Sequence, residues 1–307
     1  MSGKMKIQVN KKKKHRALLL LKIPLFLFAA YLLILFPNIV MTFDEIYEPV
    51  TRTAAVVRAD KVDLNDKEPI SILFLGIDQR EDDRGRSDTM ILLTINPTEK
   101  STKIISIPRD TYTELSGLGR SDKINHAYAF GGIDLALATT EELFDIPIDY
   151  CVLLNMEGFK AIVDALGGVA VDNSFAFDDF EAGNLTLNGD HALDYVRMRK
   201  QDPDGDFGRQ DRQKQVINSI LKKGASANIL INYPKILNAL GDNVKTTISF
   251  NDMINLQKNY TDALGTPEQL SFEKGNGKVQ NGIWYYMADS AELEQIQNTL
   301  KEHLDLH

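Results

Sequence analysis

The feature that most constrains this chain of 307 residues is a continuous apolar segment close to its start. The segment runs from Ala17 to Phe36 and holds one charge, Lys22, and the six residues before it are all basic. Twenty helical residues at about 1.5 Å each span the roughly 30 Å hydrocarbon core of a bilayer. Lys22 lies near the start, where its long side chain can reach the interface. The sequence therefore predicts a transmembrane helix over residues 17–36.

The charges on either side of this segment predict its orientation. The basic run precedes it, whereas Asp44, Glu45 and Glu48 follow it. Positive-inside bias then keeps residues 1–16 in the cytoplasm as a basic tail and exports the remainder. A cleaved signal peptide is the alternative, but the apolar run is long for one, and residues 36–41 offer no small-x-small cleavage site. We expect a single-pass type II protein of the cell membrane, with its C-terminal domain extracellular and membrane lipid as a partner.

The exported part of the chain is acidic. Residues 1–36 hold eight Lys or Arg and no Asp or Glu, so subtracting that +8 from the net charge of −8 leaves −16 on residues 37–307. Sequence-independent binding of nucleic acid needs a basic face that displaces counterions. We therefore expect no nucleic-acid partner. The single cysteine, Cys151, excludes an internal disulfide and a multi-cysteine metal site, and its apolar neighbours predict a buried structural thiol.

Residues 37–67 form a mixed, charged stretch, which we interpret as an extracellular stalk. After this stretch, apolar segments of strand and helix type alternate regularly. The expected strands cover residues 70–77, 89–95, 103–107, 150–154, 169–171, 269–272 and 283–286. The expected helices cover residues 133–144, 156–166, 191–196, 207–223, 233–240, 251–264 and 290–303. This alternation predicts an α/β domain whose central, mainly buried β-sheet is flanked by helices on both faces. We expect its core over residues 68–226 and a C-terminal extension over residues 227–307 that completes the same domain.

Charged side chains gather where the expected strands end. Asp78 follows the first strand, Arg86 and Asp88 precede the second, and Arg109 follows the third. Taken singly, Asp78 could be a turn residue, and Arg86 with Asp88 a local ion pair. Ligand sites of α/β sheets collect at strand ends, however, and carboxylates with phosphate oxygens hold Mg²⁺, while arginine grips phosphates. The combination predicts a divalent cation site beside an oxyanion clamp.

A second charged block follows further along the chain. Arg197 and Arg199 are two residues apart and point the same way only where the backbone is extended, so we expect the preceding helix to unwind there. Asp206, Arg209 and Gln213 have i, i+3, i+7 spacing and share one face at the start of a helix. A solvated charged helix face is the alternative. A helix N-terminus offers free N–H groups, however, which favours an anion there.

These blocks, in this order, resemble the LytR-CpsA-Psr family. The matching segments are Leu-Gly-Ile-Asp-Gln-Arg at 75–80, Arg-Ser-Asp-Thr-Met at 86–90, Ser-Ile-Pro-Arg-Asp-Thr at 106–111, Lys-Ile-Asn-His-Ala-Tyr at 123–128, Val-Asp-Ala-Leu-Gly-Gly-Val at 163–169, Val-Arg-Met-Arg at 196–199 and Gly-Asp-Phe-Gly-Arg-Gln-Asp-Arg-Gln at 205–213. The resemblance covers residues 70–225 and extends to the short basic tail and single anchor. The sequence does not depart from the family pattern at any of the charged positions.

The resemblance implies a transferase. The family moves anionic glycopolymers, such as wall teichoic acid or capsule, from a polyprenyl-pyrophosphate carrier to a peptidoglycan sugar hydroxyl, the 6-hydroxyl of N-acetylmuramic acid. By family analogy Asp78 and Asp88 hold Mg²⁺, with Mn²⁺ as the alternative ion. The implied fold is an α/β sheet flanked by helices, with an apolar pocket for the lipid chain.

The resemblance also implies roles for the other charged residues. The side chains around the pyrophosphate would be those of Arg86, Arg109, Lys123, Arg197, Arg199, Arg209 and Gln213. Asp206 would orient the arginine cluster. The catalytic set would then be Asp78, Asp88, Arg86, Arg109, Arg197, Arg199 and Asp206. We assign no general base, because a carboxylate that ligates Mg²⁺ is a poorer base.

Other functions fit the same residues. A polyprenyl-pyrophosphate hydrolase would use water as the acceptor and need the same metal and arginines. A non-catalytic regulator that binds lipid or wall would need the arginines without an intact metal pair. A transcriptional attenuator is disfavoured by the charge of −16 and the predicted exterior location. We expect the choice of polymer to depend on residues 175–188 and on the C-terminal extension.

Overall fold

The computed structural model describes residues 46–50, 58, 61–78, 85–224 and 243–306, which belong to one compact unit over residues 45–307. Two predicted helices, over residues 17–36 and 233–240, lie outside the described residues. Among the described residues no helix combines the length and the apolar character that crossing a membrane requires.

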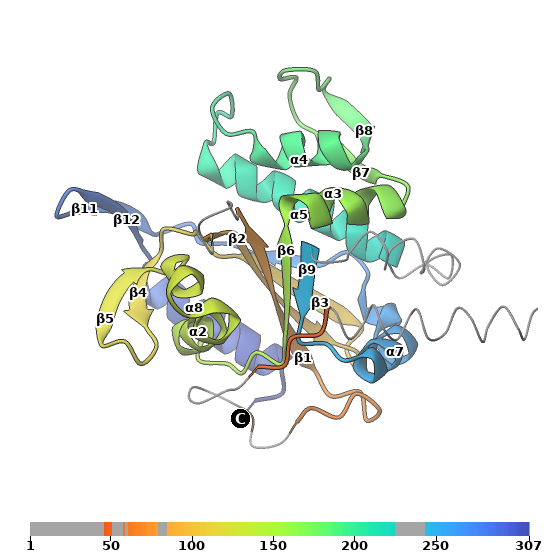
Figure 1. The fold of residues 1–307 in the computed structure, drawn as a ribbon, viewed down its shortest axis with the longest axis vertical. Helices are drawn as coiled ribbons and strands as arrows, with labels where there is room; N and C mark the ends of the chain where they lie inside the picture. Colours follow the sequence, from red (N-terminus) through yellow and green to blue (C-terminus); the bar gives the residue numbers. More distant parts are fainter. Residues whose placement is uncertain (1–45, 51–57, 59–60, 79–84, 225–242, 307) are drawn as a thin grey trace, which may run out of the picture. The chain divides into compact units, whose positions relative to one another are not determined.

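The described residues fold around a mixed sheet of six strands in the order β10-β3-β2-β1-β6-β9 (Figure 1). The strands are β1 Ile70–Ile77, β2 Ser87–Asn96, β3 Ser101–Ser106, β6 Tyr150–Asn155, β9 Val244–Thr246 and β10 Glu268–Leu270. β1 pairs antiparallel with β2 and parallel with β6. β2–β3 and β6–β9 are antiparallel, and β10–β3 is parallel.

The side chains of β1 alternate between two apolar layers, because successive strand residues point to opposite faces. Leu73 and Leu75 pack toward one face, in a cluster with Leu137 of helix α2 (His126–Phe144) and Leu300 of helix α8 (Ser290–His303). Ile72 packs toward the other face, with Tyr260 just after helix α7 (Phe250–Asn259). Both faces are therefore covered, which explains the almost uninterrupted apolar sequence of β1. The expected α/β sheet flanked by helices on both faces is confirmed.

Three further helices complete the domain around one end of the sheet (Figure 1). They are α3 (Met156–Ala165), α4 (Gly189–Arg197) and α5 (Asp206–Gly224). The α3 helix starts where the sequence predicts, because the Asn155 side chain accepts a hydrogen bond of 2.8 Å from the Gly158 N–H. It ends at two glycines with positive φ, of which Gly168 has no room for a β-carbon: one would lie 2.8 Å from the Leu187 carbonyl oxygen.

Three two-stranded hairpins project from this framework. They are β4–β5 (Tyr112–Leu115 and Arg120–Lys123), β7–β8 (Val169–Asn173 and Gly183–Leu187) and β11–β12 (Asn276–Gln280 and Ile283–Met287). The sequence predicted β7 and β12 but not their partner strands. The helix expected over residues 251–264 is shorter, because α7 ends at Asn259 and a 3₁₀ turn follows at Thr261–Ala263. Between them the buried Tyr260 donates its hydroxyl to the Glu68 carbonyl at 2.5 Å and turns the chain into the core.

The C-terminal residues build part of the same sheet. β9 pairs with β6, and β10 pairs with β3, at the two edges of the six strands. Cys151 lies in β6 and is fully buried, as the sequence predicts for a structural thiol.

Candidate functional site

A cavity of about 370 Å³ lies between the sheet and helices α3, α4 and α5. Its walls are mostly apolar. The apolar lining consists of Phe74, Leu75, Ile77, Val152, Leu154, Met156, Phe159, Ile162, Leu193, Val196, Ile217, Ile220 and Leu221. The charged and amide side chains in the lining are Asp78, Asp88, Arg109, Arg197, Arg209, Asn155 and Gln213. The cavity therefore combines a long apolar surface with two carboxylates and three guanidinium groups.

Strand pairing brings the two carboxylates together at one end of two central strands, β1 and β2. Asp78 directly follows β1, and Asp88 is the second residue of β2, its antiparallel neighbour. The register shifts between Gly76 and Ile77, and the backbone N–H groups of Asp78 and Asp88 both donate to the Arg86 carbonyl, at 3.3 and 3.0 Å. One irregular corner of the β1–β2 pair thus carries both acids into the cavity lining.

Arg109 is held beside Asp88. Its guanidinium lies 3.0 Å from the Asp88 carboxylate, and Asn125 approaches the same carboxylate oxygen at 3.5 Å. The side chains of Arg109 and Asp88 are 26% and 37% exposed, so this ion pair borders water rather than the protein interior. Such a pair contributes little to stability, and its charges face the cavity.

The end of α4 separates the two arginines of the Val-Arg-Met-Arg block. Arg197 is the last helical residue, and Met198 has extended dihedrals (φ −58°, ψ 133°), so the helix unwinds where the sequence predicts. Arg197 and Arg199 are both exposed, but only Arg197 belongs to the cavity lining. The predicted extended backbone is present, yet it does not bring both guanidinium groups to this cavity.

Helix α5 presents one continuous stripe to the cavity. Arg209 and Gln213 occupy its first turns, and Ile217 and Ile220 continue the stripe at helical spacing. The Gln213 amide donates to the Thr89 hydroxyl at 3.1 Å and so ties α5 to β2. The backbone of Asp206 starts this helix, and its side chain lies outside what the structure describes.

Two other predicted residues lie outside the lining. The Lys123 ammonium is 2.5 Å from the Asp110 carboxylate and 5.8 Å from the centre of the Tyr285 ring. Asp110 also lies 3.7 Å from the Arg109 guanidinium, so Lys123 is linked to the cavity through one intermediate acid. Arg86 is exposed and contributes its backbone carbonyl to the corner described above.

Sequence reasoning missed Arg212, which positions the end of α4. This arginine is 4% exposed and donates to the backbone carbonyls of Tyr195 and Met198 and to the Asp202 carboxylate. Its guanidinium also lies 5.4 Å from the centre of the Phe177 ring. No local sequence signal separates Arg212 from Arg209, because the two are three residues apart and such residues are neighbours on a helix surface. Arg212 therefore holds the backbone on either side of Arg197 rather than facing the cavity.

The carboxylates of Asp78 and Asp88 match one kind of metal site. Within the described ranges no group of three or more His, Cys, Asp or Glu could hold a metal ion by itself. Mg²⁺ commonly uses one or two carboxylates together with phosphate oxygens of a ligand and water. Two carboxylates in one lining fit that pattern when a phosphate-bearing ligand supplies the remaining oxygens.

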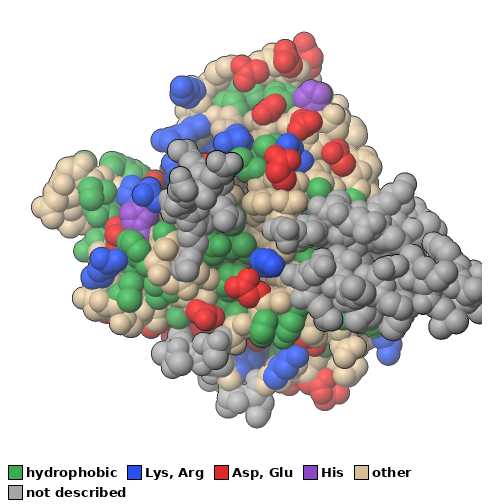
Figure 2. All heavy atoms as spheres, viewed as in Figure 1, with side chains coloured by type: hydrophobic (Ala, Val, Ile, Leu, Met, Phe, Trp, Pro, Cys, Tyr) green, Lys and Arg blue, Asp and Glu red, His purple; other side chains and the backbone are tan. Residues whose placement is uncertain are grey.

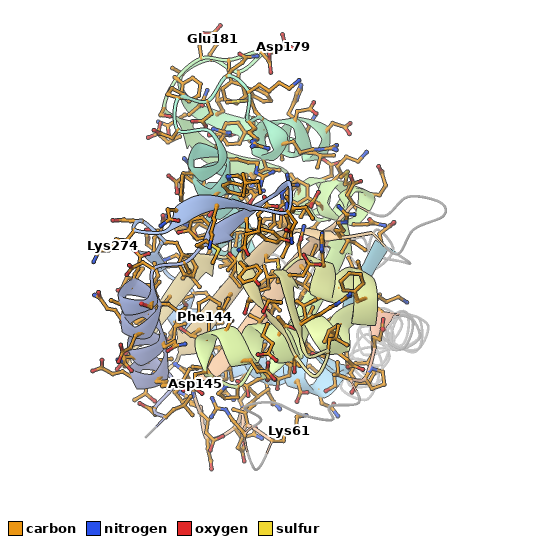
Figure 3. The ribbon with its side chains drawn as sticks, turned by 90° about the vertical axis from the view of Figure 1, so that its left-hand side faces the viewer. Lys61, Phe144, Asp145, Asp179, Glu181 and Lys274 are labelled. Atoms are coloured by element: carbon orange, nitrogen blue, oxygen red, sulfur yellow. The ribbon has the colours of Figure 1, made fainter. Side chains whose placement is uncertain are left out.

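A second hollow of about 360 Å³ borders the first and shares Arg197 with it. Its other lining residues are Asp178, Asp179, Phe180, His191, Asp194 and Met198. Figure 2 shows acidic side chains gathered at the top of the molecule, over the β7–β8 hairpin, and Figure 3 shows Asp179 and Glu181 pointing outward from the same end. The two hollows thus differ in charge, since the first sets three arginines against two carboxylates and the second sets one arginine against three.

Comparison with known proteins identifies similar chains. The model of the LytR_cpsA_psr family matches residues 35–302. A polyisoprenyl-teichoic acid–peptidoglycan teichoic acid transferase TagU from Bacillus mycoides (strain KBAB4) is 46% identical over 275 residues, which are 88% of this chain and 90% of that protein. The crystal structure of B. subtilis TagU has a TM-score of 0.64 at 44% identity and covers 78% of this chain and 97% of its own. A structure of TagT bound to LIIa-WTA has a TM-score of 0.71 at 32% identity and covers 84% of this chain and 99% of its own.

Proposed function

The chain belongs to the LytR-CpsA-Psr family, and from that premise we propose that it is a membrane-anchored transferase that attaches an anionic glycopolymer to peptidoglycan. The donor is a polymer linked to polyprenyl pyrophosphate, and the acceptor is a sugar hydroxyl of the wall. The curated relatives named as teichoic acid transferases support the reaction class. Teichoic acid is accordingly the first polymer to test.

One observation carries this proposal: a single cavity combines an apolar interior with a cluster of arginines and carboxylates. A polyprenyl pyrophosphate has the same division, because its hydrocarbon chain is apolar and its head carries about two to three negative charges. Phe74, Ile217 and Leu221 offer the surface for the chain. Arg109, Arg197 and Arg209 offer the charge for the head.

The arginines also suit the chemical step. The oxygen of the acceptor hydroxyl attacks the phosphorus that is linked to the sugar, and the bond from that phosphorus to the bridging oxygen breaks. Polyprenyl phosphate leaves with the electron pair, and the hydroxyl proton passes to solvent. Phosphoryl transfer depends mainly on alignment and on stabilising charge, which three guanidinium groups around one phosphate group provide.

We also propose that Asp78 and Asp88 hold Mg²⁺ or Mn²⁺ when the donor is bound. The ion would neutralise charge on the phosphate oxygens and on the departing polyprenyl phosphate. Arg86, Lys123 and Arg199 are proposed to contact the donor outside the cavity lining, and Asp206 to orient the arginine cluster.

The second hollow is the proposed path of the acceptor. Arg197 borders both hollows, so a hydroxyl that enters from the second would reach the phosphate held in the first. Carboxylates of Asp178, Asp179 and Asp194 repel the anionic polymer but accept hydrogen bonds from sugar hydroxyls. The charge difference between the hollows would keep the donor in the first hollow and the acceptor in the second.

The test uses the full chain in detergent with a polyprenyl-pyrophosphate-linked saccharide, peptidoglycan oligomers and Mg²⁺, with and without EDTA. Mass spectrometry should detect glycan phosphate on the muramic acid residue, and EDTA should abolish it. Release of polyprenyl phosphate without that adduct would instead identify a hydrolase. Tight binding of the donor with neither product would identify a lipid-binding regulator.

A further inference from the structure

The β11–β12 hairpin carries an exposed apolar surface that the transfer reaction does not use. Val279, Ile283 and Trp284 are 64%, 47% and 47% exposed. Trp284 is the only tryptophan of the chain. Figure 1 shows this hairpin projecting from the domain on the left. Large apolar side chains that are exposed together mark a surface for interaction.

These three side chains occupy both faces of the hairpin. Val279 pairs with Trp284 across the two strands, and Gln280 pairs with Ile283. Directly opposed residues share a face, and successive residues alternate. Val279 and Trp284 therefore lie on one face, and Ile283 lies on the other. A protein partner that packs on a hairpin covers one face, whereas the headgroup layer of a bilayer surrounds an inserted hairpin on both.

The charge of the hairpin is opposite to that of the domain. Residues 274–288 include Lys274 and Lys278 and no Asp or Glu, although residues 37–307 carry −16 in total. Lysines near an anionic leaflet attract its headgroups, and tryptophan prefers the level of the headgroups. The turn of the hairpin consists of Asn281 and Gly282, both with positive φ, and their polar backbone suits the hydrated interface rather than the hydrocarbon.

A neighbouring hairpin extends the same surface. Leu118, in the turn of β4–β5, is 44% exposed, and Phe130 of α2 is 47% exposed. The Arg120 guanidinium lies over the Phe130 ring, 4.4 Å from the centre of that ring. Five of the eight large apolar side chains that are exposed among the described residues thus belong to these elements. The rings of Tyr112 and Tyr285 contact each other edge to face at 5.1 Å and join the two hairpins. Figure 3 faces this side of the molecule and shows Lys274 pointing away from the ribbon.

The base of the hairpin is attached to the cavity. The Tyr286 N–H donates to the Asp110 carbonyl at 2.9 Å, and Thr111 bridges to Tyr286. Asp110 directly follows Arg109, which lines the cavity. A membrane contact at the hairpin would therefore hold the charged part of the cavity near the headgroup layer, where a lipid pyrophosphate presents its charge.

We propose that the β11–β12 hairpin is a second membrane contact, which inserts Val279, Ile283 and Trp284 into the headgroup layer of an anionic bilayer. The inference rests on the proposed function in one respect, namely that the domain works at a membrane surface. It does not depend on whether the bound lipid is transferred or hydrolysed.

The single tryptophan makes the contact measurable in the full chain. The protein is reconstituted into vesicles of phosphatidylcholine and phosphatidylglycerol, with or without bromine on the acyl carbons nearest the headgroups. Bromine quenches a tryptophan that lies in the bilayer. Trp284 emission should fall by about half in brominated vesicles, and Lys274→Gln with Lys278→Gln should reduce the quenching.

A matched control moves the tryptophan to another exposed apolar position. Ile254 is 50% exposed and belongs to α7, which Figure 1 shows at the right, whereas the hairpin projects at the left. Trp284→Phe combined with Ile254→Trp should show no quenching. Equal emission of Trp284 in both vesicle types would overturn the proposal, and so would emission that changes with protein density in unbrominated vesicles, which indicates a second copy as the occupant. Transfer activity measured in the same vesicles reports separately on the proposed function.

Discussion

The two ends of strand β2 show how polar groups differ between a site and a structural cluster. The strand begins with Ser87 and Asp88, at the cavity, and ends at Asn96, beneath helix α8. At the first end the charges lie in the lining of a cavity and are partly exposed to water. At the second end the polar atoms contact one another inside the protein.

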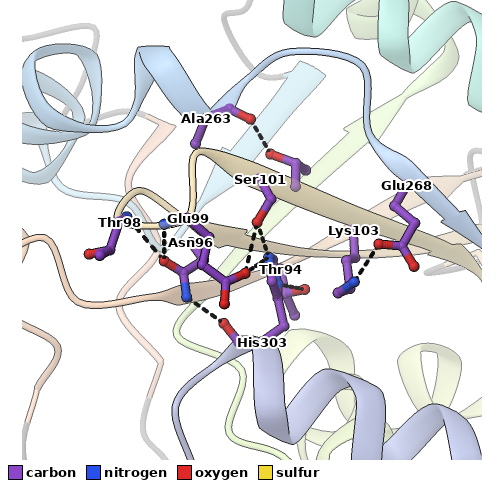
Figure 4. A network of polar contacts seen from close by, with 10 residues as sticks. Thr94, Asn96, Thr98, Glu99, Ser101, Lys103, Ala263, Glu268 and His303 are labelled. Carbon is purple, nitrogen blue, oxygen red and sulfur yellow. Dashed lines mark hydrogen bonds and ion pairs between the residues drawn. The ribbon is translucent and has the colours of Figure 1, made fainter.

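His303 organises the second end (Figure 4). It is 2% exposed, and its two ring nitrogens lie 2.7 Å from the Thr94 hydroxyl and 2.8 Å from the Ser101 hydroxyl. Asn96 donates to the His303 carbonyl at 3.1 Å, and its own side-chain oxygen accepts from the backbone N–H groups of Thr98 and Glu99. This network fastens the C-terminal helix to β2 and β3.

The two ends of β2 show how polar groups that serve a site can be told apart from polar groups that stabilise the fold. Polar groups that satisfy one another in the interior stabilise a particular packing. At the wall of the cavity the Arg109–Asp88 ion pair borders water, and such a pair adds little stability. The arginines of the cavity are therefore better explained by a charged ligand, whereas His303 is explained by the fold.

The largest expected effect comes from removing an arginine of the cavity. Arg197→Ala should lower transfer by about 10²–10³-fold, as for loss of one group that stabilises developing charge, and should leave thermal unfolding almost unchanged. The matched variant is Arg199→Ala, since Arg199 is also exposed and lies two residues away. Because Arg199 is proposed to contact the donor from outside the lining, its removal should lower the rate less than the removal of Arg197. Steady-state rates of both variants measure the loss of transfer, and melting curves test whether the fold is unchanged. Equal losses of rate in the two would show that cavity lining does not identify the arginines that matter.

The next effect concerns an arginine that supports the cavity from inside. Arg212→Ala leaves the buried Asp202 carboxylate without its partner, and breaking such a pair costs about 3–5 kcal/mol. Urea unfolding should therefore show a large loss of stability, unlike Arg197→Ala. A small loss of stability combined with a large loss of rate would instead place Arg212 in contact with the donor.

A smaller effect should appear at the other end of β2. His303→Ala removes a buried hydrogen bond to Thr94 and a partly buried one to Ser101, and it should cost about 1–3 kcal/mol. Transfer measured at a temperature where the variant remains folded should be unchanged. A loss of transfer without a loss of stability would contradict the comparison between the two ends.

The same histidine predicts a dependence of stability on pH. Burial, and then the nearby Lys103, lower the pKa of His303 below its usual 6.5. The unfolded chain then binds a proton that the folded chain resists, so stability should fall as the pH drops below 6.5 toward the lower folded value. Unfolding measured across this window should lose that component in His303→Gln. Exposed His191 provides the control, because His191→Gln should leave the component intact.

The smallest effect should concern the acceptor. His191→Ala and Asp194→Asn change the second hollow and should raise the KM for peptidoglycan oligomers about 5- to 10-fold, in keeping with the loss of one or two hydrogen bonds. The KM for the lipid donor should not change. An increase in the donor KM alone would place the donor, rather than the acceptor, in this hollow.

Local signals were sufficient for much of the fold. The expected strand over residues 70–77 and the helix over residues 290–303 coincide with β1 and α8. Asn155 caps α3 as predicted, since a cap depends on residues within one turn of the chain. β9 and β10 are three residues long and lie at the edges of the sheet, so they owe their place to partners far away in the sequence.

The sequence by itself determined which residue types this protein brings to its site, because the ordered charged blocks and the strands before them can be recognised within short stretches of the chain. Only the tertiary structure decided which of those charges share a cavity. It placed Arg197 in the lining and Arg199 outside it, attached Lys123 to Asp110, and buried Arg212 beneath the end of α4. The physical reason is that these outcomes depend on the packing of α4 against α5 and on strand pairing, which join residues that no local pattern connects.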